Sequence, residues 1–176
     1  LAVLVRTAGH ALLYDAGPAY GLEGDSGERL VVPALRALGV ARLDALVLTH
    51  NDSDHTGGAQ SVLDNLEVGA LRTSLPERHP LLSMALAPAL CRRGQSWEWD
   101  GVRFEVLHPA PGAHARRRND ESCVLLIAAG GAAMLLAGDI ERGVEAELLR
   151  AGAPRAEALL VPHHGSRSSS SEAFLD

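Results

Sequence analysis

Six consecutive positions of the chain hold four residues that can bind a metal. The segment LVLTHNDSDHTGG contains His50, Asp52, Asp54 and His55, directly after an apolar run and directly before two glycines. The apolar run predicts a buried strand, so the four side chains are expected in a loop at the end of that strand. One imidazole and one carboxylate can then face each of two neighbouring sites, and such ligands suit Zn, Mn or Fe. The alternative is a polar turn in which Asp54 or Thr56 caps the next helix.

Two later apolar runs also end in residues of metal-ligand type. The run AAMLLAGD ends in Asp139, and the run LLVPHHGS contains His163 and His164. Asp139 alone suits the N-cap of a helix equally well. Three strands that all end in such residues favour a catalytic centre assembled at strand ends on an α/β scaffold.

The pattern of apolar residues predicts both β-hairpins and β–α alternation, which favours an α/β sandwich whose sheets are covered by helices. Strands are expected over 1–5, 11–14, 43–49, 69–73, 102–107, 123–128, 133–137 and 156–161. Helices are expected over 30–38, 59–66, 80–93 (interrupted at Pro88) and 141–150. The arginines at 116–118 and the serine run 168–171 are expected to be solvated loops.

Length and composition are those of one globular domain. The 176 residues are 47% hydrophobic and 22% charged, which suits a single domain over residues 1–176. No apolar run reaches the roughly 18–20 residues that span a bilayer. The chain lacks an initiator Met, and both ends are expected to have been excised from a longer protein. Cys91 and Cys123 are expected to be buried thiols.

The formal net charge of −6 has the wrong sign for a simple nucleic-acid binder. Two divalent ions would reduce it to about −2 and would place the added positive charge at the cleft. Arg116, Arg117 and Arg118 could line that cleft and contact phosphates, or they could form a basic loop without a ligand.

At these positions the sequence resembles the metallo-β-lactamase superfamily. The family signature HxHxDH corresponds to the segment His50–His55, the lone Asp after a strand to Asp139, and the final His to the segment His163–Ser166. Asp15-Ala16-Gly17 matches the Asp-x-Gly that follows the family's opening hairpin. With the Asn-x-x-Ser segment 119–122, the pattern is most similar to the β-lactamase-like domain of the ComEC family of DNA-uptake channels, and more distantly to phosphorylcholine esterases.

This resemblance implies an αββα sandwich, truncated at both ends, with a metal site at one edge of the sheets. It implies a nuclease that degrades the DNA strand not imported during natural competence. The domain would belong to an integral membrane protein, on the outer side of the bacterial inner membrane. Its partners would be the membrane channel portion of the same parent chain and DNA, which it would contact through backbone phosphates without reading sequence.

The resemblance also implies a site with two divalent ions. His50 and Asp52 are assigned to one ion; Asp54, His55 and His164 to the other; Asp139 bridges them. Asp54 and His163 are the candidate catalytic residues, with His163 facing the substrate as a proton donor, although which of His163 and His164 binds metal stays open. The candidate supporting residues are Asp15, Asn119 and Ser122. The other histidines, at 10, 79, 108 and 114, are expected on the surface or in loops.

Two departures from the family pattern bear on the metal and the reaction. Asp52 stands where the family usually has His, and a harder carboxylate ligand favours Mn or Mg over Zn. The family's third His has no counterpart here. The alternatives are therefore another hydrolase of this fold, such as a lactonase, β-lactamase or phosphorylcholine esterase, or a degenerate module that only binds DNA or a partner.

Overall fold

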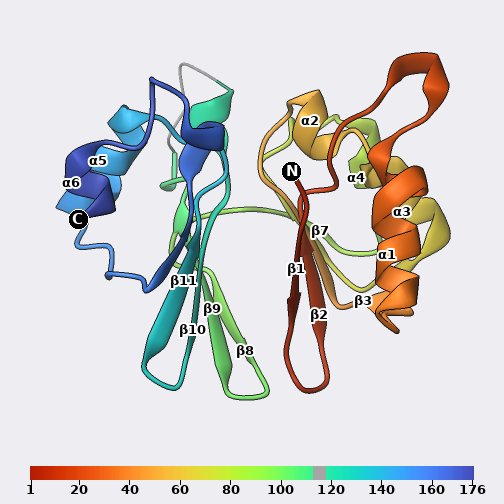
Figure 1. Cartoon of the computed structure of the whole chain (residues 1–176), viewed down its shortest axis with the longest axis horizontal. Coiled ribbons are helices and arrows are strands. Elements are labelled where there is room, and N and C mark those ends of the chain that lie inside the picture. The colour runs from red at the N-terminus through yellow and green to blue at the C-terminus, as the bar shows by residue number, and fades with distance from the viewer. Residues whose placement is uncertain (113–117) are drawn as a thin grey trace. The chain divides into compact units, whose positions relative to one another are not determined.

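The computed structural model describes residues 1–112 and 118–176. It divides the chain into two compact units, Leu1–Leu90 and Cys91–Asp176. Each unit has one five-stranded sheet with helices packed beside it (Figure 1). Within the described residues, no helix is both long enough and apolar enough to cross a membrane.

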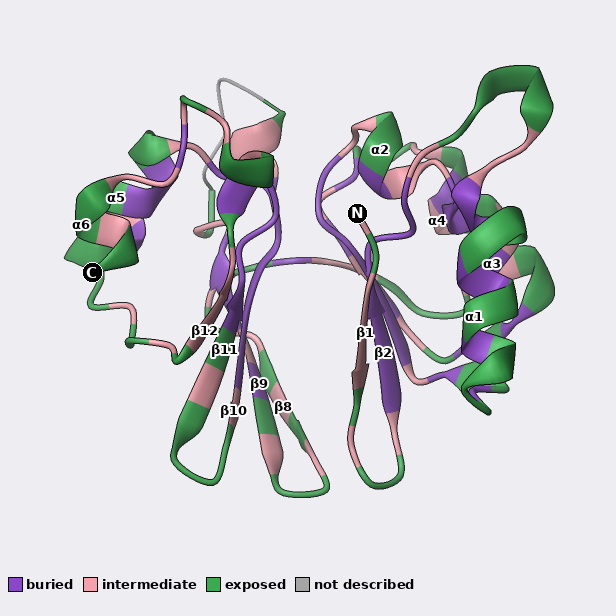
Figure 2. Ribbon diagram, viewed as in Figure 1, coloured by how far each residue is buried: buried purple, intermediate pink, exposed green. Residues whose placement is uncertain are grey.

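The first unit is built on a mixed sheet with the order β1-β2-β4-β6-β7. Its strands are β1 (Val3–Arg6), β2 (Ala11–Tyr14), β4 (Ala45–Leu48), β6 (Leu71–Thr73) and β7 (Pro88–Leu90). β1 and β2 form an antiparallel hairpin, whereas β2, β4, β6 and β7 run parallel. β3 (Arg42–Leu43) and β5 (Glu67–Val68) form a separate parallel pair. Every residue of β2 is buried (Figure 2), and so is every residue of β4.

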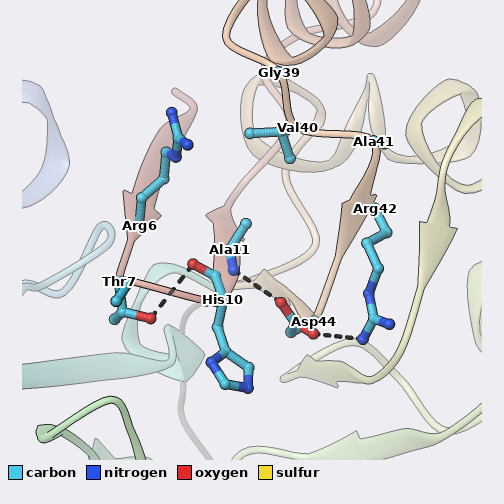
Figure 3. A pocket seen from close by; sticks show the side chains of 11 residues that line it. Arg6, Thr7, His10, Ala11, Gly39, Val40, Ala41, Arg42 and Asp44 are labelled. Carbon is cyan, nitrogen blue, oxygen red and sulfur yellow. Dashed lines mark hydrogen bonds and ion pairs between the residues drawn. The ribbon is translucent and has the colours of Figure 1, made fainter.

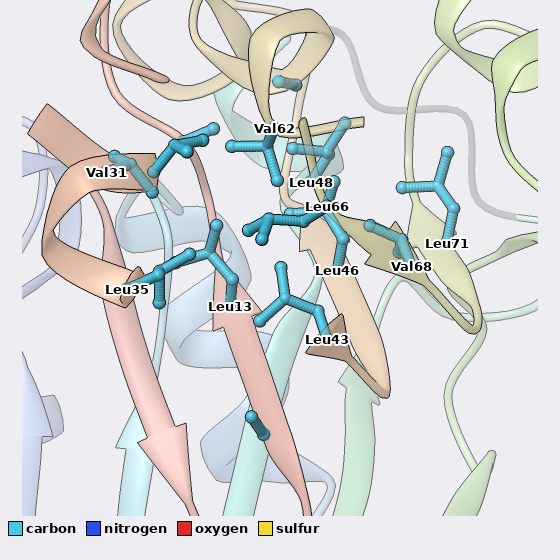
Figure 4. Close-up of a cluster of buried hydrophobic side chains, with 14 of the residues drawn as sticks. Leu13, Val31, Leu35, Leu43, Leu46, Leu48, Val62, Leu66, Val68 and Leu71 are labelled. Atoms are coloured by element: carbon cyan, nitrogen blue, oxygen red, sulfur yellow. The ribbon is translucent and has the colours of Figure 1, made fainter. Parts of the chain in front are cut away.

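Helices and apolar side chains cover this sheet. The helices are α1 (Val32–Ala37), which continues a π-turn over Gly27–Val31, then α2 (Ser53–Thr56), α3 (Ala59–Asn65) and α4 (Pro80–Met84); a 3-10 turn spans Gly21–Glu23. Leu13, Leu46 and Leu48 of the strands pack with Leu35 of α1 and Val62 of α3 (Figure 4). This core fixes the end of β4, where the first candidate ligands begin.

The second unit has the sheet order β12-β11-β10-β9-β8. The strands are β8 (Ser96–Trp99), β9 (Val102–His108), β10 (Val124–Ala129), β11 (Ala132–Leu136) and β12 (Ala158–Leu160). All neighbours are antiparallel except β11 and β12. α5 (Arg142–Arg150) buries Val144 and Leu148 against the sheet, and α6 (Glu172–Leu175) is the last helix. Short 3-10 turns cover Asn119–Glu121 and Pro162–Gly165.

Several predicted elements differ from those observed. The helix expected over 80–93 ends at Met84, and Pro88 begins β7 instead of interrupting a helix. Proline has no N–H to donate, but an edge strand such as β7 tolerates it. The strand expected over 43–49 is split at Asp44 into β3 and β4. Asp44 leaves the strand path because its carboxylate accepts hydrogen bonds from the Ala11 amide and the Arg42 guanidinium.

Two further expectations are wrong. Cys91 and Cys123 are joined in a disulfide, not buried as free thiols; their pairing across 32 positions could not be read from the spacing. The serine run Ser168–Ser171 is not a solvated loop, because Ser169 is 2% exposed and its hydroxyl donates to the carbonyl of Pro162. The hairpin expected at Gly130-Gly131 is confirmed by β10 and β11.

Candidate functional site

The first group of candidate ligands follows β4 directly. Thr49 and His50 are fully buried just beyond the end of the strand. Asp52 then precedes the single-turn helix α2, which carries Asp54 and His55. His55 is fully buried, whereas the side chain of Asp54 is about half exposed (51%). The turn therefore places the imidazoles inside the fold and the carboxylates at its surface.

A buried carboxylate holds this turn in place. Asp15 is fully buried at the end of β2. Its Oδ1 accepts a hydrogen bond from the Thr49 amide at 2.9 Å, and its Oδ2 accepts one from the Thr49 hydroxyl at 3.0 Å. Oδ2 also lies 2.7 Å from Nδ1 of His55. Asp15 thus joins the ends of the parallel strands β2 and β4 to the helix that carries Asp54.

These hydrogen bonds determine which nitrogen of each imidazole carries the proton. A carboxylate only accepts, so Nδ1 of His55 must donate to Asp15. The single hydroxyl hydrogen of Thr49 goes to Asp15, so Nδ1 of His50, 2.9 Å from that hydroxyl oxygen, is the donor in this pair. In both histidines Nε2 is therefore the nitrogen with the lone pair, which is the form that binds metals.

Each of these lone-pair nitrogens has a carboxylate beside it. Nε2 of His50 lies 3.7 Å from Oδ2 of Asp52, and Nε2 of His55 lies 3.4 Å from Oδ2 of Asp54. The two rings are 4.3 Å apart between centroids. The structure thus brings the four residues together as two adjacent imidazole–carboxylate pairs. Nitrogen and carboxylate oxygen donors of this kind fit a first-row divalent cation.

Two glycines let the turn pack closely against the rest of the unit. A Cβ at Gly57 would collide with the amide of Ala19, and a Cβ at Gly58 would collide with the carbonyl oxygen of Ala16. The amide of Gly58 donates to the carbonyl of Gly17 at 3.1 Å. Glycine is therefore required at these two positions because other backbone segments approach too closely for a Cβ. A left-handed backbone is not the reason, since neither glycine has a positive φ.

The second unit holds Asp139 at the end of β11. Asp139 is 5% exposed and follows Gly138, whose φ is +58°. Its amide donates to the Ser122 hydroxyl at 3.1 Å, and that hydroxyl donates to the carbonyl of Asn119 at 2.6 Å. Asp139 does not cap α5, which has Glu141 at its N-cap position. The Asn119–Ser122 segment thus supports the backbone that presents Asp139.

The paired histidines follow β12 in a strained turn. His163 and His164 have φ of +49° and +52°, a left-handed conformation that costs about 1–2 kcal/mol for a residue with a Cβ. The His163 amide donates to the carbonyl of Gly138 at 3.1 Å, which ties this turn to the loop of Asp139. Strained residues of this kind cluster at functional sites.

The side chains of the two histidines have different partners. Nε2 of His164 lies 3.7 Å from Oδ2 of Asp139, and the His164 side chain is about half exposed (52%). The ring of His163 contacts the Asn119 amide nitrogen, 3.2 Å from Nε2, and the Ser168 hydroxyl, 3.3 Å from Nδ1. Asp139 is therefore paired with His164, whereas His163 lies in a separate polar network.

The predicted arginine contacts are only partly covered by the structure. Arg116 and Arg117 lie outside the described residues. Arg118 is exposed and directly precedes the 3-10 turn that carries Asn119. It therefore lies next in sequence to the residue that contacts His163.

His108 differs from the expectation of a surface or loop residue. It ends β9 and is 3% exposed. Its Nε2 donates to the carbonyl of Asp120 at 2.8 Å, which anchors the turn of Asn119. Burial lowers the pKa of the His108 imidazole, so the ring is neutral at pH 7. His79 instead caps α4 by accepting from the Leu81 amide.

The first unit also has a hollow of about 480 Å³ at the β1–β2 turn (Figure 3). Arg6, His10, Arg42 and Asp44 are among its lining residues. Arg6 donates to the carbonyl of Leu38 and Arg42 pairs with Asp44. The hollow is lined by residues at the start of β2 and before β4, and none of the predicted site residues is among them.

Three residues of these networks were not predicted from the sequence. Thr49 has a direct signal, since it is a polar residue at the end of an apolar strand and next to the first ligand. Glu141 and Ser168 contact the region of His163, but they come from a helix N-terminus and a serine run. No spacing rule connects those two segments to the histidine pair.

Comparison with known families and proteins agrees with the pattern of these residues. The sequence model of the family described as "Metallo-beta-lactamase superfamily" matches residues 1–176. The chain is 40% identical to the competence protein ComA of Neisseria gonorrhoeae, over all of this chain and 24% of ComA. It is 34% identical to recombination protein 2 of Haemophilus influenzae, over 99% of this chain and 21% of that protein. The chain thus spans less than a quarter of these relatives.

Several solved structures with similar folds are metallo-β-lactamases. A metallo-β-lactamase mutant of Cronobacter sakazakii with a HARLDQ motif has a TM-score of 0.64 and 15% identity, over 90% of this chain and 70% of that chain. MEM-A1, a subclass B3 enzyme from a soil metagenome library, has a TM-score of 0.64 and 13% identity, over 93% and 72%. These likenesses confirm the predicted fold class.

Proposed function

Because this chain belongs to the metallo-β-lactamase superfamily, we propose that it is a metal-dependent phosphodiesterase that degrades DNA during natural competence. The observation that carries the proposal is the pair of imidazole–carboxylate contacts in the first unit, His50 with Asp52 and His55 with Asp54. Two adjacent sites of this composition suit two divalent ions, and two-metal sites recur in enzymes that cleave phosphodiesters.

The proposed ligands of the first unit are His50 and Asp52, which would hold one ion, and Asp54 and His55, which would hold the other. Asp139 and His164 of the second unit are the further proposed ligands. Divalent ions in such a site neutralise charge on the phosphoryl oxygens and make water a better nucleophile. Asp15 and Thr49 orient the two imidazoles of the first unit, and Ser122 supports Asp139.

The protein's own side chains bind and orient the scissile phosphodiester. His163 faces the leaving oxygen as its proton donor, and Asn119 supports the His163 ring. Arg118, together with Arg116 and Arg117, which lie outside the described residues, is proposed to contact backbone phosphates without reading sequence. Asp54 is the proposed catalytic carboxylate. Its side chain is 51% exposed, more than the 36% of Asp52, which is the other carboxylate of this turn.

Mn²⁺ is the proposed metal, with Zn²⁺ or Mg²⁺ as poorer substitutes. Asp52 replaces an imidazole by a carboxylate beside His50. A harder oxygen ligand shifts the preference of a site away from Zn²⁺. Three proposed carboxylate ligands, Asp52, Asp54 and Asp139, would give the site the oxygen-rich character that Mn²⁺ prefers.

The biological setting is inferred from the relatives and the disulfide. ComA is named a competence protein, and the chain is also 34% identical to ComE operon protein 3 of Bacillus subtilis over 85% of this chain and 20% of that protein. Disulfides persist in oxidising compartments, so the Cys91–Cys123 bond supports a location on the outer side of the bacterial inner membrane. The membrane channel portion of the parent chain is its proposed partner there.

A panel of substrates tests the class of reaction. We expect the Mn²⁺-loaded protein to cleave single- or double-stranded DNA and to leave a chromogenic β-lactam, an acyl-homoserine lactone and p-nitrophenyl phosphorylcholine nearly unchanged. Hydrolysis of one of these small molecules in preference to DNA would identify a different hydrolase of this fold. Binding of DNA with no hydrolysis of any substrate, with every metal tried, would identify a binding module.

A further inference from the structure

The serine run is fixed between the turn of His163 and the start of α5. The hydroxyl of Ser169 donates to the carbonyl of Pro162 at 2.9 Å, and the carbonyl of Ser168 accepts from the Arg142 amide at 3.1 Å. Glu145, fully buried in α5, accepts hydrogen bonds from Ser170 and Ser171. The run is therefore part of the framework around the paired histidines.

One serine of this run lies between His163 and a carboxylate. The Ser168 hydroxyl donates to Oε1 of Glu141 at 3.0 Å, and its oxygen lies 3.3 Å from Nδ1 of His163. The same Glu141 oxygen is 3.8 Å from that nitrogen. Glu141 itself is held by its amide, which donates to Oδ1 of Asp120 at 3.0 Å.

The direction of these hydrogen bonds sets the tautomer of His163. The hydroxyl hydrogen of Ser168 is used by Glu141, so Nδ1 of His163 must carry the hydrogen that points at Ser168. A histidine fixed in this way through Nδ1 exchanges protons through Nε2. In the neutral ring Nε2 accepts from the Asn119 side-chain amide at 3.2 Å, so Asn119 holds the second nitrogen of the ring.

We propose that Ser168 and Glu141 are positioning residues, which hold the His163 ring so that Nε2 delivers a proton to the leaving oxygen. This inference rests on the proposed phosphodiesterase function. In the reaction a water oxygen bonds to phosphorus and the bond from phosphorus to the sugar oxygen breaks. The proton on Nε2 passes to that oxygen, and the proton released by the attacking water passes to solvent. The neutral His163 then regains a proton from solvent.

The leaving group separates this role from a merely structural one. The sugar alkoxide of DNA needs a proton as it departs, whereas p-nitrophenolate is a stable anion and departs without one. Removing the Ser168 hydroxyl or the Glu141 carboxylate should therefore slow cleavage of DNA far more than cleavage of bis(p-nitrophenyl) phosphate. A general loss of fold or of metal would slow both reactions together.

The test compares two variants with two matched controls, each with Mn²⁺ and with folding checked by circular dichroism. The variants are Ser168→Ala and Glu141→Gln. The controls are Ser171→Ala and Glu145→Gln, which alter the same serine run and the same helix but do not contact His163. We expect both variants to lower kcat on a dinucleotide by about 10- to 100-fold, with KM unchanged and with less than about a threefold effect on bis(p-nitrophenyl) phosphate.

Ser168→Thr keeps the hydroxyl and should retain kcat on the dinucleotide. Equal losses on the two substrates, or losses as large in the two controls, would overturn the positioning role while leaving the phosphodiesterase function intact. A wild-type protein that cleaves neither diester would overturn the proposed function and this inference with it. Should Ser168→Ala fail to fold, the comparison of Glu141→Gln with Glu145→Gln decides the question.

Discussion

At the scale of single residues, Asp15 and Thr49 decide which nitrogen of each histidine is available to a ligand. Asp15 accepts from His55 and Thr49, and Thr49 accepts from His50. The three hydrogen bonds leave Nε2 of both rings as the nitrogen with the lone pair, which is the atom that would contact the proposed metal ions. The supporting residues thus prepare the site before any ion is bound.

Asp15→Asn should weaken metal binding without unfolding the first unit. The amide can present an oxygen to Thr49 but loses the charge behind His55, and such changes reduce metal affinity by about 10- to 100-fold. Competition with a fluorescent Mn²⁺ chelator measures the affinity. Asp44→Asn, which alters a carboxylate at the opposite end of the strands, is the control and should keep wild-type affinity. Equal affinities for Asp15→Asn and wild type would contradict this role.

His108 should make the second unit sensitive to acid. Burial lowers the pKa of the folded imidazole below its ordinary value of 6.5. The unfolded chain therefore binds more protons as the pH falls through about 6.5, and the free energy of unfolding decreases. Urea titrations at pH 7 and pH 5 should show a smaller loss for His108→Gln than for wild type, with His10→Gln as the control for removing one imidazole. An equal loss in His108→Gln would rule this out.

The residue types of the candidate site could be predicted from sequence, but part of its hydrogen-bond network could not. The positions of the candidate site residues stand out because His and Asp follow apolar strands at His50, Asp139 and the pair His163–His164. Glu141 and Ser168 carry no such signal, since a helix N-cap and a serine are common in any fold. Only the folded chain shows that both contact one histidine.

At the scale of elements, the first group of ligands depends on how closely α2 and α3 follow β4. His50 lies just after the strand, and Asp54 and His55 lie on the single turn of α2. Gly57 and Gly58 connect that turn to α3 with backbone atoms of the β2 loop against them. The carboxyl ends of β2 and β4, which are parallel neighbours, thereby share one set of polar contacts.

Gly58→Ala should distort this connection. A Cβ there would collide with the backbone carbonyl of Ala16, and neither backbone segment can move as a side chain would. We expect a loss of about 2–3 kcal/mol in the free energy of unfolding, together with weaker metal binding. Gly143→Ala is the control, because nothing lies within 4 Å of its added Cβ and alanine favours a helix by up to about 1 kcal/mol. A Gly58→Ala protein as stable as wild type would contradict the close-packing argument.

Elements with strong periodicity were predicted well, and short ones were not. The hairpin of β10 and β11 has apolar strands around Gly130-Gly131, so its local signals agree with one another. β7, in contrast, is three residues long and begins at Pro88. It is stabilised by pairing with β6, a tertiary contact that no local pattern reports.

At the scale of the whole molecule, the fold was predictable because the ligand motifs occur in the order and at the strand ends that one superfamily uses. The family model matches the whole chain, whereas the chain itself matches 20–24% of its curated relatives. The disulfide was missed because cysteine spacing alone does not determine pairing. Cys91 directly follows β7 and Cys123 directly precedes β10. Only the folded chain shows that these two positions meet.

The central claim is that DNA cleavage depends on divalent ions and on the proposed ligand residues of each unit. The most direct measurement is the rate of DNA cleavage against Mn²⁺ concentration, after removal of metal with EDTA, for wild type, Asp54→Ala of the first unit and Asp139→Ala of the second. Asp64→Ala, an exposed carboxylate on α3, is the control. We predict no cleavage in EDTA, recovery with Mn²⁺ that exceeds recovery with Zn²⁺, and a loss of at least about 100-fold in both ligand variants. Cleavage in EDTA, or wild-type rates in either ligand variant, would contradict the account.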